Sequence, residues 1–180
     1  SSHYHLLVTK WFVECWLAAI EYKRPQEKPL EEIASKALKA GEIFWMPAGF
    51  PLIGDVSPDC SPGSLSCLVD PEEEEWQNRL VPDRQNRFRT LRWSPPANSN
   101  DLEAEGWVRM EQGSWAAIWY ASPDGWSPQP GHSHRDFGSF ELHYGSERVF
   151  VDPGRRSYGP AGDEDISAES HNTLTLDGLE

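Results

Sequence analysis

Four side chains toward the C-terminal end of the chain are suited to metal binding or proton transfer: His132, His134, Asp152 and His171. Imidazole nitrogens and carboxylate oxygens are ligands of zinc and of similar divalent ions. The same groups accept and donate protons near neutral pH. We therefore interpret residues 131–178 as a metal-binding and catalytic region.

A strand through residues 132–136 would place several of these groups on one face. Alternate residues of a strand share a face, so His132, His134 and Asp136 align. Asp152 follows a strand at a Pro-Gly turn, and His171 opens a later strand. Adjacent strands lie about 4.8 Å apart, so side chains from neighbouring strands can reach one ion. We expect Asp136 to orient a histidine rather than to bind the metal.

Each of these residues also has a plainer interpretation. His132 and His134 fall in a segment rich in Pro and Gly and can belong to a surface loop. Asp152 can be a turn residue before Pro153, and His171 can cap the end of a strand. The His-x-His pair alone is weak evidence, and it gains weight only together with Asp152 and His171.

The composition argues against nucleic acid and membrane partners. The 180 residues include 16 basic and 29 acidic ones, a net charge of −13, whereas nucleic-acid binding needs a basic face. No apolar run approaches the ~20 residues that span a bilayer. The first residues lack the order of a signal peptide, so a leader, if the protein is exported, is not in this chain. An anionic substrate would need a local basic patch, which we expect from Arg148, Arg155 and Arg156.

The cysteines and tryptophans give weaker indications. Cys60 and Cys67 lie in a loop rich in Pro, Ser and Gly, and form either a small disulfide or two free thiols. Cys15 falls in an apolar helical stretch, and we expect it in the core. The nine Trp are core residues or stacking platforms for sugar rings.

The first part of the chain is expected to be helical. Apolar spacing predicts a helix over 2–23 and a second over 29–40. Repeated prolines predict a loop over 47–75. A polar linker or a partly helical connection follows over 79–101.

From about residue 105 the pattern changes to that of strands. Residues 106–113 and 114–121 form one predicted hairpin, and 139–144 and 147–153 form another. Residues 172–178 alternate apolar and polar side chains, which predicts a half-buried strand. Helices followed by strands indicate an α+β fold with two segments, 1–100 and 101–180, and a boundary near 95–104.

The strand at 139–144 has two faces of different character. We expect Phe140, Leu142 and Tyr144 to face the core and Glu141 and His143 to be exposed. The reverse arrangement is the alternative.

The C-terminal region resembles the heparinase II/III-like family of polysaccharide lyases. The motifs that carry the resemblance are, in order, His132-Ser-His134-x-Asp136, Ser139-Phe140-Glu141-Leu142, the Gly145 turn, Val151-Asp152-Pro153-Gly154, Tyr158 and His171-Asn172-Thr173-x-Thr175-x-Asp177-Gly178. At the other end, Ser1-Ser2-His3-Tyr4-His5 is similar to the family's Ser-Pro-x-Tyr-His segment, and Ile53-Gly54-Asp55 to its Ile-Gly-Asp loop.

The resemblance implies a fold and a reaction. The fold is the C-terminal helices of an (α/α) toroid followed by the first strands of an antiparallel β-sandwich, in a fragment of a larger enzyme. The reaction is β-elimination at a uronic acid of an acidic polysaccharide, glycosaminoglycan or alginate-like, by a periplasmic or secreted protein.

The resemblance also implies roles for single residues. Tyr4 would be the catalytic base and acid, and His132 its partner in proton handling or in neutralising the uronate. The metal ligands would be His134, Asp152 and His171, and the ion a divalent metal, zinc in the family. The residues implied to support the site or contact substrate are Asp136, Arg155, Tyr158 and Asn172.

Two other functions fit parts of the sequence. Residues 163–169 are acidic where the family often carries an arginine, which favours a non-catalytic carbohydrate-binding or polysaccharide-biosynthesis accessory protein. A His-x-His pair followed by a Glu and a distant His is also typical of cupin-like metal enzymes. Glu141 follows His134 at a longer spacing than in cupins, and the helical first half suits a cupin barrel poorly.

Overall fold

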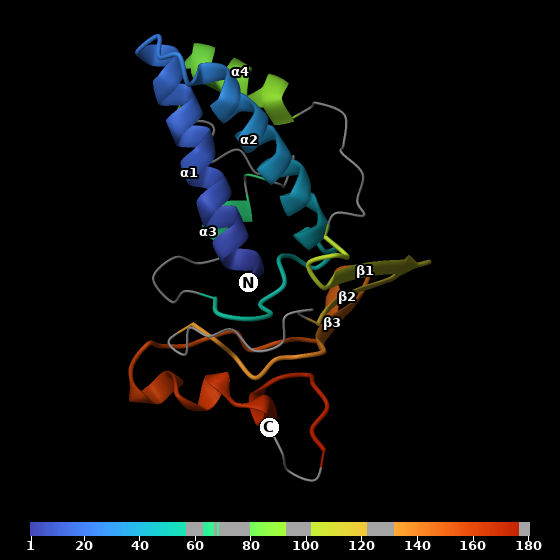
Figure 1. The fold of residues 1–180 in the computed structure, drawn as a ribbon. Helices are drawn as coiled ribbons and strands as arrows, with labels where there is room; N and C mark the ends of the chain where they lie inside the picture. The colour runs from blue at the N-terminus through green and yellow to red at the C-terminus, as the bar shows by residue number, and fades with distance from the viewer. Residues whose placement is uncertain (57–62, 67, 69–79, 93–101, 122–131, 177–180) are drawn as a thin grey trace.

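The fold consists of a group of helices beside one antiparallel sheet (Figure 1). In the computed structural model the described residues are 1–56, 63–66, 68, 80–92, 102–121 and 132–176. Cys60, Cys67 and most of the expected segment boundary lie outside them. Helices precede strands along the chain, so the predicted α+β class is confirmed. No helix of the described residues is long and apolar enough to cross a membrane.

Two antiparallel helices form the first layer. Helix α1 spans Ser2–Glu21, and the side chain of Ser1 caps it by accepting the backbone N–H of Tyr4. Helix α2 spans Glu27–Gly41 and is followed by the 3-10 helix η1, Glu42–Phe44. Both predicted helices are confirmed, with ends shifted by one to two residues. The imidazole Nε2 of His5 lies 2.8 Å from the carbonyl oxygen of Ala37 and links α1 to α2.

Cys15 is exposed on α1, so its predicted place in the core is wrong. Val13 is fully buried on the same helix. Two residues along a helix turn a side chain by about 200°, which directs Cys15 away from the face that Val13 buries.

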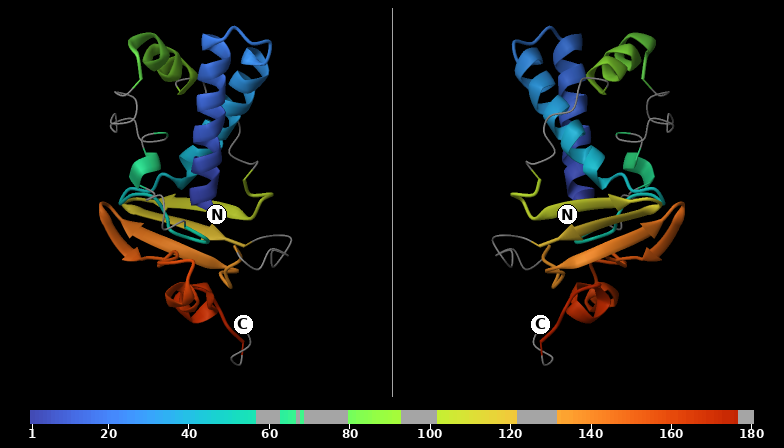
Figure 2. Two further views of the ribbon diagram at one scale, coloured as in Figure 1. Left: turned by 90° about the vertical axis from the view of Figure 1, so that its left-hand side faces the viewer. Right: turned by 90° about the vertical axis from the view of Figure 1, so that its right-hand side faces the viewer.

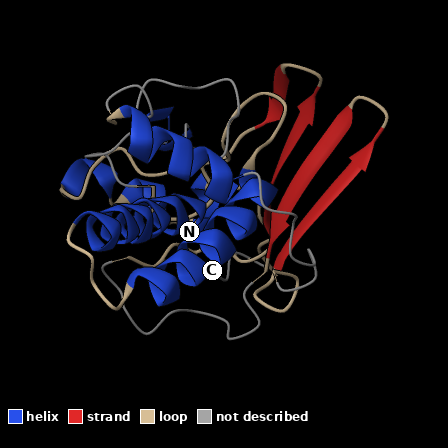
Figure 3. Cartoon of the chain, turned by 90° about the horizontal axis from the view of Figure 1, so that it is seen from above, coloured by secondary structure: helices blue, strands red, loops and turns tan. Residues whose placement is uncertain are grey.

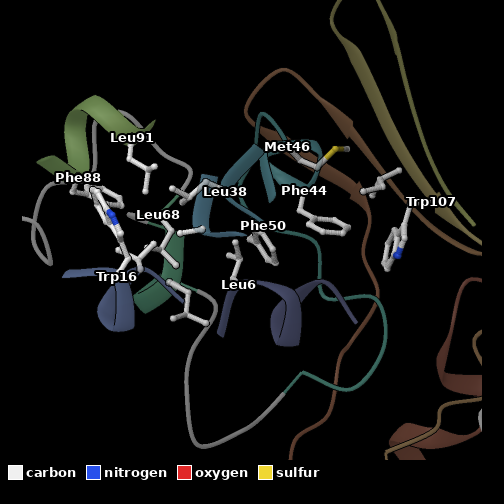
Figure 4. Packing of buried hydrophobic residues seen from close by; sticks show 14 of the residues in the cluster. Leu6, Trp16, Leu38, Phe44, Met46, Phe50, Leu68, Phe88, Leu91 and Trp107 are labelled. Atoms are coloured by element: carbon white, nitrogen blue, oxygen red, sulfur yellow. The ribbon is translucent and has the colours of Figure 1, made fainter. Parts of the chain in front are cut away.

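The core lies among the helices and extends to the first strand (Figure 4). The polar connection over 79–101 contains helix α4, Pro82–Arg92, whose buried Phe88 and Leu91 pack on the core. Short helix α3 spans Gly63–Ser66. The Phe44 and Trp107 rings meet edge to face with centroids 4.8 Å apart, which joins the helices to the sheet.

Within the described residues the sheet has four antiparallel strands in chain order. They are β1 (Trp107–Gln112), β2 (Trp115–Tyr120), β3 (Ser139–Tyr144) and β4 (Glu147–Phe150). Both predicted hairpins are confirmed. The sheet stands to one side of the helices (Figure 3), and the segment after β4, with 3-10 helices η4 (Pro160–Gly162), η5 (Glu164–Ile166) and η6 (Ala168–Ser170), lies on its far side from them (Figure 2).

The predicted strand at 172–178 is wrong over its described part. Residues 172–175 form a turn and an irregular segment and Leu176 makes a β-bridge, and Leu174 and Leu176 are 94% and 78% exposed. The segment is held by side chains instead: Asn172 Nδ2 donates to the Phe140 carbonyl at 2.9 Å, and Thr173 Oγ1 donates to the Phe137 carbonyl. Alternation alone does not supply a neighbouring strand, and over 172–175 side-chain hydrogen bonds anchor the backbone.

The expected orientation of β3 is also wrong. Glu141 and His143 are fully buried, whereas Tyr144 is 50% exposed. The physical reason is the chain that crosses the inner face of β3, residues 45–56, which we name the junction loop. Its backbone N–H groups need acceptors there, and an apolar face would leave them unpaired.

Glu141 and His143 supply these acceptors. Glu141 Oε1 accepts the backbone N–H of Leu52 at 2.6 Å, and His143 Nδ1 accepts that of Ala48 at 3.2 Å. His143 therefore carries its proton on Nε2, which lies 3.4 Å from Glu141 Oε2. Arg148 completes the contact by donating to the carbonyls of Ala48 and Phe50 at 3.1 Å each.

Glu141 is expected to make stability depend on pH. Burial raises the pKa of Glu141 to about 7 from 4.5, against the lowering effect of its backbone N–H bonds. Its contribution to the free energy of unfolding is present below about pH 4.5 and is lost as pH rises through 7, by roughly 1.4 kcal/mol per pKa unit. Denaturant titrations across this range should show the decline in the unmodified chain and a flatter profile in Glu141→Gln. Glu147→Gln, an exposed control on β4, should keep the decline; identical profiles for both variants would refute the assignment.

Candidate active site

The candidate site lies where the first turn of α1 meets the junction loop and the segments on either side of the sheet. Tyr4 comes from α1 and Asp55 from the junction loop. His132 and His134 come from the segment before β3, and Tyr158 from the segment after β4. The N-terminal end of α1 points toward these segments (Figures 1 and 2).

Tyr4, His132 and Tyr158 form a connected polar cluster. The Tyr4 hydroxyl lies 3.0 Å from the Tyr158 hydroxyl and 3.5 Å from His132 Nδ1. The Tyr158 hydroxyl donates to Asp55 Oδ2 at 3.4 Å. Because that bond uses the only hydroxyl hydrogen of Tyr158, Tyr4 is the donor in the bond between the two tyrosines.

Basic side chains surround Asp55 on several sides. Its Oδ2 lies 2.7 Å from His132 Nδ1, and its Oδ1 lies 3.5 Å from Arg155 Nη1 and 3.7 Å from His134 Nε2. Burial opposes ionisation, but the interactions with His134 and His132 and the charge of Arg155 hold the pKa of Asp55 below its usual value. The site is therefore built around a buried carboxylate anion.

The environment keeps the proton on Tyr4. Burial raises the pKa of the Tyr4 phenol above its usual value, and the bond to Tyr158 and the negative charge of Asp55 raise it further. The arrangement makes Tyr4 a proton donor in the resting site.

A second cluster contains the three predicted metal ligands. His134 Nδ1 lies 3.2 Å from His171 Nε2, and Asp152 Oδ2 lies 2.9 Å from His171 Nδ1. Ser139 Oγ and the backbone N–H of Gly154 donate to Asp152 at 2.8 and 3.0 Å. Burial opposes protonation of His171, but the bond to Asp152 outweighs it and raises the pKa of the imidazole.

Residues 94–180 match the model of a family described as heparinase II/III-like, C-terminal. The match covers just under half of the chain and supports the resemblance of this part to the heparinase II/III-like family. The protein also resembles two solved structures of the heparan sulfate lyase HepC from Pedobacter heparinus, a mutant with a TM-score of 0.64 and a second structure with a TM-score of 0.60. Each is 18% identical, and the match covers 99% of this chain and 29% of the other, so the chain spans less than a third of their length. At this identity the likeness shows the fold. No curated protein matches.

The heparinase II/III-like segment supplies only part of the site. His132, His134, Asp152 and His171 lie within residues 94–180, whereas Tyr4 precedes them by more than 90 residues of sequence. The structure brings the Tyr4 hydroxyl to within 3.5 Å of His132 Nδ1.

The backbone around the three predicted site histidines differs from the prediction. Residues 132–136 form a loop rather than a strand, and His171 follows η6 rather than opening a strand. The loop is held by the backbone N–H of Arg135, which donates to the Ile166 carbonyl at 2.9 Å, and by a turn from Asp136 to Ser139. Consequently the three aligned side chains do not share one face: His132 is exposed, while His134 and Asp136 are buried.

The remaining predicted residues take supporting positions. Asp136 is buried, and burial raises the pKa of its carboxyl. The Arg155 guanidinium lies 4.4 Å from the Tyr158 ring centroid and pairs with Asp55, so it orients both. Asn172 bonds the Phe140 carbonyl, which anchors the backbone.

The three arginines expected to form a basic patch each interact with other groups of the protein. Arg148 donates to junction-loop carbonyls and Arg155 pairs with Asp55. Arg156 pairs with Asp165 at 2.8 Å and with Glu164 at 3.6 Å. Each guanidinium therefore already has a partner within the protein.

The fit of a metal to the second cluster is partial. In the described residues no group of three or more His, Cys, Asp or Glu side chains has the geometry to hold an ion. Yet two imidazole nitrogens face each other, and Asp152 bonds the other nitrogen of His171, where a carboxylate commonly orients a ligating histidine. Nε2 of His134 is buried without a hydrogen-bond partner among the described residues.

Asp55 is the site residue that sequence reasoning missed. Its only signal was the likeness of Ile53-Gly54-Asp55 to a family loop, to which no role was attached. Asp55 and His132 are 77 residues apart in the sequence, so no local pattern could pair them.

Gly154 is expected to fix the turn that holds Asp152 against the junction loop. Its φ is +65°, and an added Cβ would lie 3.3 Å from Val56 Cβ and 3.5 Å from Leu52 Cβ. Gly113, in the β1–β2 turn, has φ +60° and open space around it. Gly113→Ala should therefore cost only the left-handed backbone, roughly 1 kcal/mol, and Gly154→Ala a further ~1–3 kcal/mol of crowding. Chemical unfolding measures both; equal losses would show that the close approach does not matter.

Proposed function

We propose that the protein is a polysaccharide lyase that cleaves a uronic-acid-containing polysaccharide by β-elimination, as part of a larger enzyme. The proposal rests on the contact between Tyr4 and His132, in which the Tyr4 hydroxyl lies 3.5 Å from His132 Nδ1. The same nitrogen of His132 bonds the buried Asp55. The family of residues 94–180 and the HepC-like fold support it. A location in the periplasm or outside the cell belongs to the same proposal.

The reaction requires a base, an acid and compensation of the uronate charge. A base takes the proton on the carbon next to the carboxylate, a carbon–carbon double bond forms, and the bond to the glycosidic oxygen breaks as that oxygen takes a proton. Tyr4, which holds its proton in the resting site, suits the acid. His132, with Nδ1 toward Asp55, has Nε2 left as the base.

We propose a divalent ion, zinc, at the second cluster. The separation of 3.2 Å between His134 Nδ1 and His171 Nε2 is close to that of two nitrogens on tetrahedral zinc, about 3.4 Å for bonds of ~2.1 Å. Asp152 would orient His171 or complete the ligand set, as the resemblance implies. When bound, the ion would hold the loop of His134, two residues from His132, and so stabilise the site.

A non-catalytic carbohydrate-binding protein is the second candidate. The observation that favours it is the pairing of Arg148, Arg155 and Arg156 within the protein, which leaves them committed to internal partners. An acidic polymer would then need its charge compensated by other groups.

Removing either proton-transfer group should abolish turnover. Tyr4→Phe and His132→Ala should each lower the elimination rate by about 10²–10⁴-fold. The assay follows the near-ultraviolet absorbance of the unsaturated uronate product on a panel of uronic-acid polymers. Tyr22→Phe is the control, because Tyr22 is 69% exposed just beyond α1. Binding of a polymer without any unsaturated product would favour the accessory protein.

Metal content tests the second cluster separately. The purified chain should contain close to one zinc, and His134→Ala should lose it. His132→Ala should retain the ion, since His132 bonds Asp55 and lies outside the ligand pair. Elemental analysis of the unmodified chain and the two variants measures the zinc content. Zinc retained in His134→Ala would contradict the assignment of His134 as a ligand.

A further inference from the structure

Asp55 and His132 form a pair in which one partner is fixed and the other is open to solvent. The His132 side chain is 56% exposed, whereas that of Asp55 is 2% exposed. An exposed imidazole ordinarily samples several rotamers and carries its proton on either nitrogen. The 2.7 Å contact between His132 Nδ1 and Asp55 Oδ2 restricts both the rotamer and the tautomer of the ring.

We propose that Asp55 is the positioning residue of the site: it fixes the His132 ring with the proton on Nδ1 and leaves Nε2 as the proton acceptor. The catalytic part of this inference rests on the proposed lyase function, and the structural part does not. Asp55 acts through His132, whose ring would contact the substrate.

The tautomer follows from what Asp55 can do as a partner. A carboxylate anion has only acceptor sites, so the nitrogen facing it must carry the hydrogen. Free imidazole in water favours the proton on the other nitrogen, Nε2. The pair therefore imposes a state that an exposed histidine would not otherwise prefer.

Asp55 itself is held at both of its carboxylate oxygens and at its backbone. Arg155 Nη1 and His134 Nε2 lie at Oδ1, at 3.5 and 3.7 Å, and the Tyr158 hydroxyl donates to Oδ2 at 3.4 Å. The Asp55 carbonyl accepts Ser1 Oγ at 2.9 Å. Ser1 is the cap of the helix that carries Tyr4, so one short segment sets the positions of Tyr4 and of His132 together.

The groups around Asp55 also predict the orientation of the side-chain amide in Asp55→Asn. In Asp55→Asn the carboxamide oxygen should take the position of Oδ1, because Arg155 is a donor there. The amide NH₂ would then face His132 Nδ1 and donate to it. The ring would have to carry its proton on Nε2, the inverse of the original state, with little change in shape.

The experiment reads the tautomer directly by nitrogen NMR of the histidine rings at about pH 9, above the usual imidazole range. His132→Ala identifies the resonance. We expect the proton on Nδ1 of His132 in the unmodified chain and on Nε2 in Asp55→Asn. Asp163→Asn, the same chemical change at an exposed site, should leave the spectrum of His132 unchanged. A proton on Nε2 in the unmodified chain, or no change in a folded Asp55→Asn, would overturn the proposal.

Turnover gives the second readout. If His132 is the base, Asp55→Asn should lower kcat by roughly 10²-fold with little change in KM, because the ring keeps its place and loses its acceptor. A purely structural role would instead change stability or KM. The expected tautomers together with no lyase activity in the full-length enzyme would refute the proposed function and leave the positioning role standing, so the two failures are distinguishable.

Discussion

The packing of the junction loop over the inner face of β3 is the contact on which the rest of the structure depends. The face is polar where a sheet usually buries apolar side chains, and its buried carboxylate must be met by donors at hydrogen-bond distance. Glu141 takes the backbone N–H of Leu52, and His143 takes that of Ala48. A shift of the loop by one residue would leave these groups unpaired. The helices and the sheet therefore have one relative position, and this position brings Tyr4 to His132.

The sequence was informative where structure is decided locally. The helix at 2–23 and the two hairpins follow from apolar spacing and turn glycines, which act within a few residues. The buried face of β3 could not be predicted in this way, because the alternation of Phe140 and Glu141 is compatible with burial of either face. What decides it is a loop some 90 residues earlier in the chain. The residues 132–136 show the same limit: the motif located the histidines, but tertiary hydrogen bonds and not strand periodicity set their directions.

The chain's overall charge says little about the charge at the site. At physiological ionic strength a net charge of −13 is screened beyond about 8 Å, so the groups around Tyr4 matter more than the distant acidic residues. Those groups are an ionised Asp55 and the Arg155 that pairs with it. Tyr4 is half-buried beside this carboxylate, and desolvation together with the negative charge of Asp55 raises the pKa of the phenol, so Tyr4 keeps its proton. A uronate entering this site would add negative charge and would hold that proton more firmly, until the leaving oxygen develops charge and takes it.

The candidate site is divided between two parts of the chain. The family match begins at residue 94 and includes both clusters of histidines, yet the proton donor and the orienting carboxylate come from residues 4 and 55. Taken alone, the matched part would present an exposed His132 with neither its tautomer nor its direction fixed. The helical half thus supplies Asp55, the carboxylate that would orient His132 as a base in the proposed reaction. The relevant unit of function is the junction between the halves, because only there do a donor, an acceptor and the carboxylate that orients it come within hydrogen-bond reach of one another.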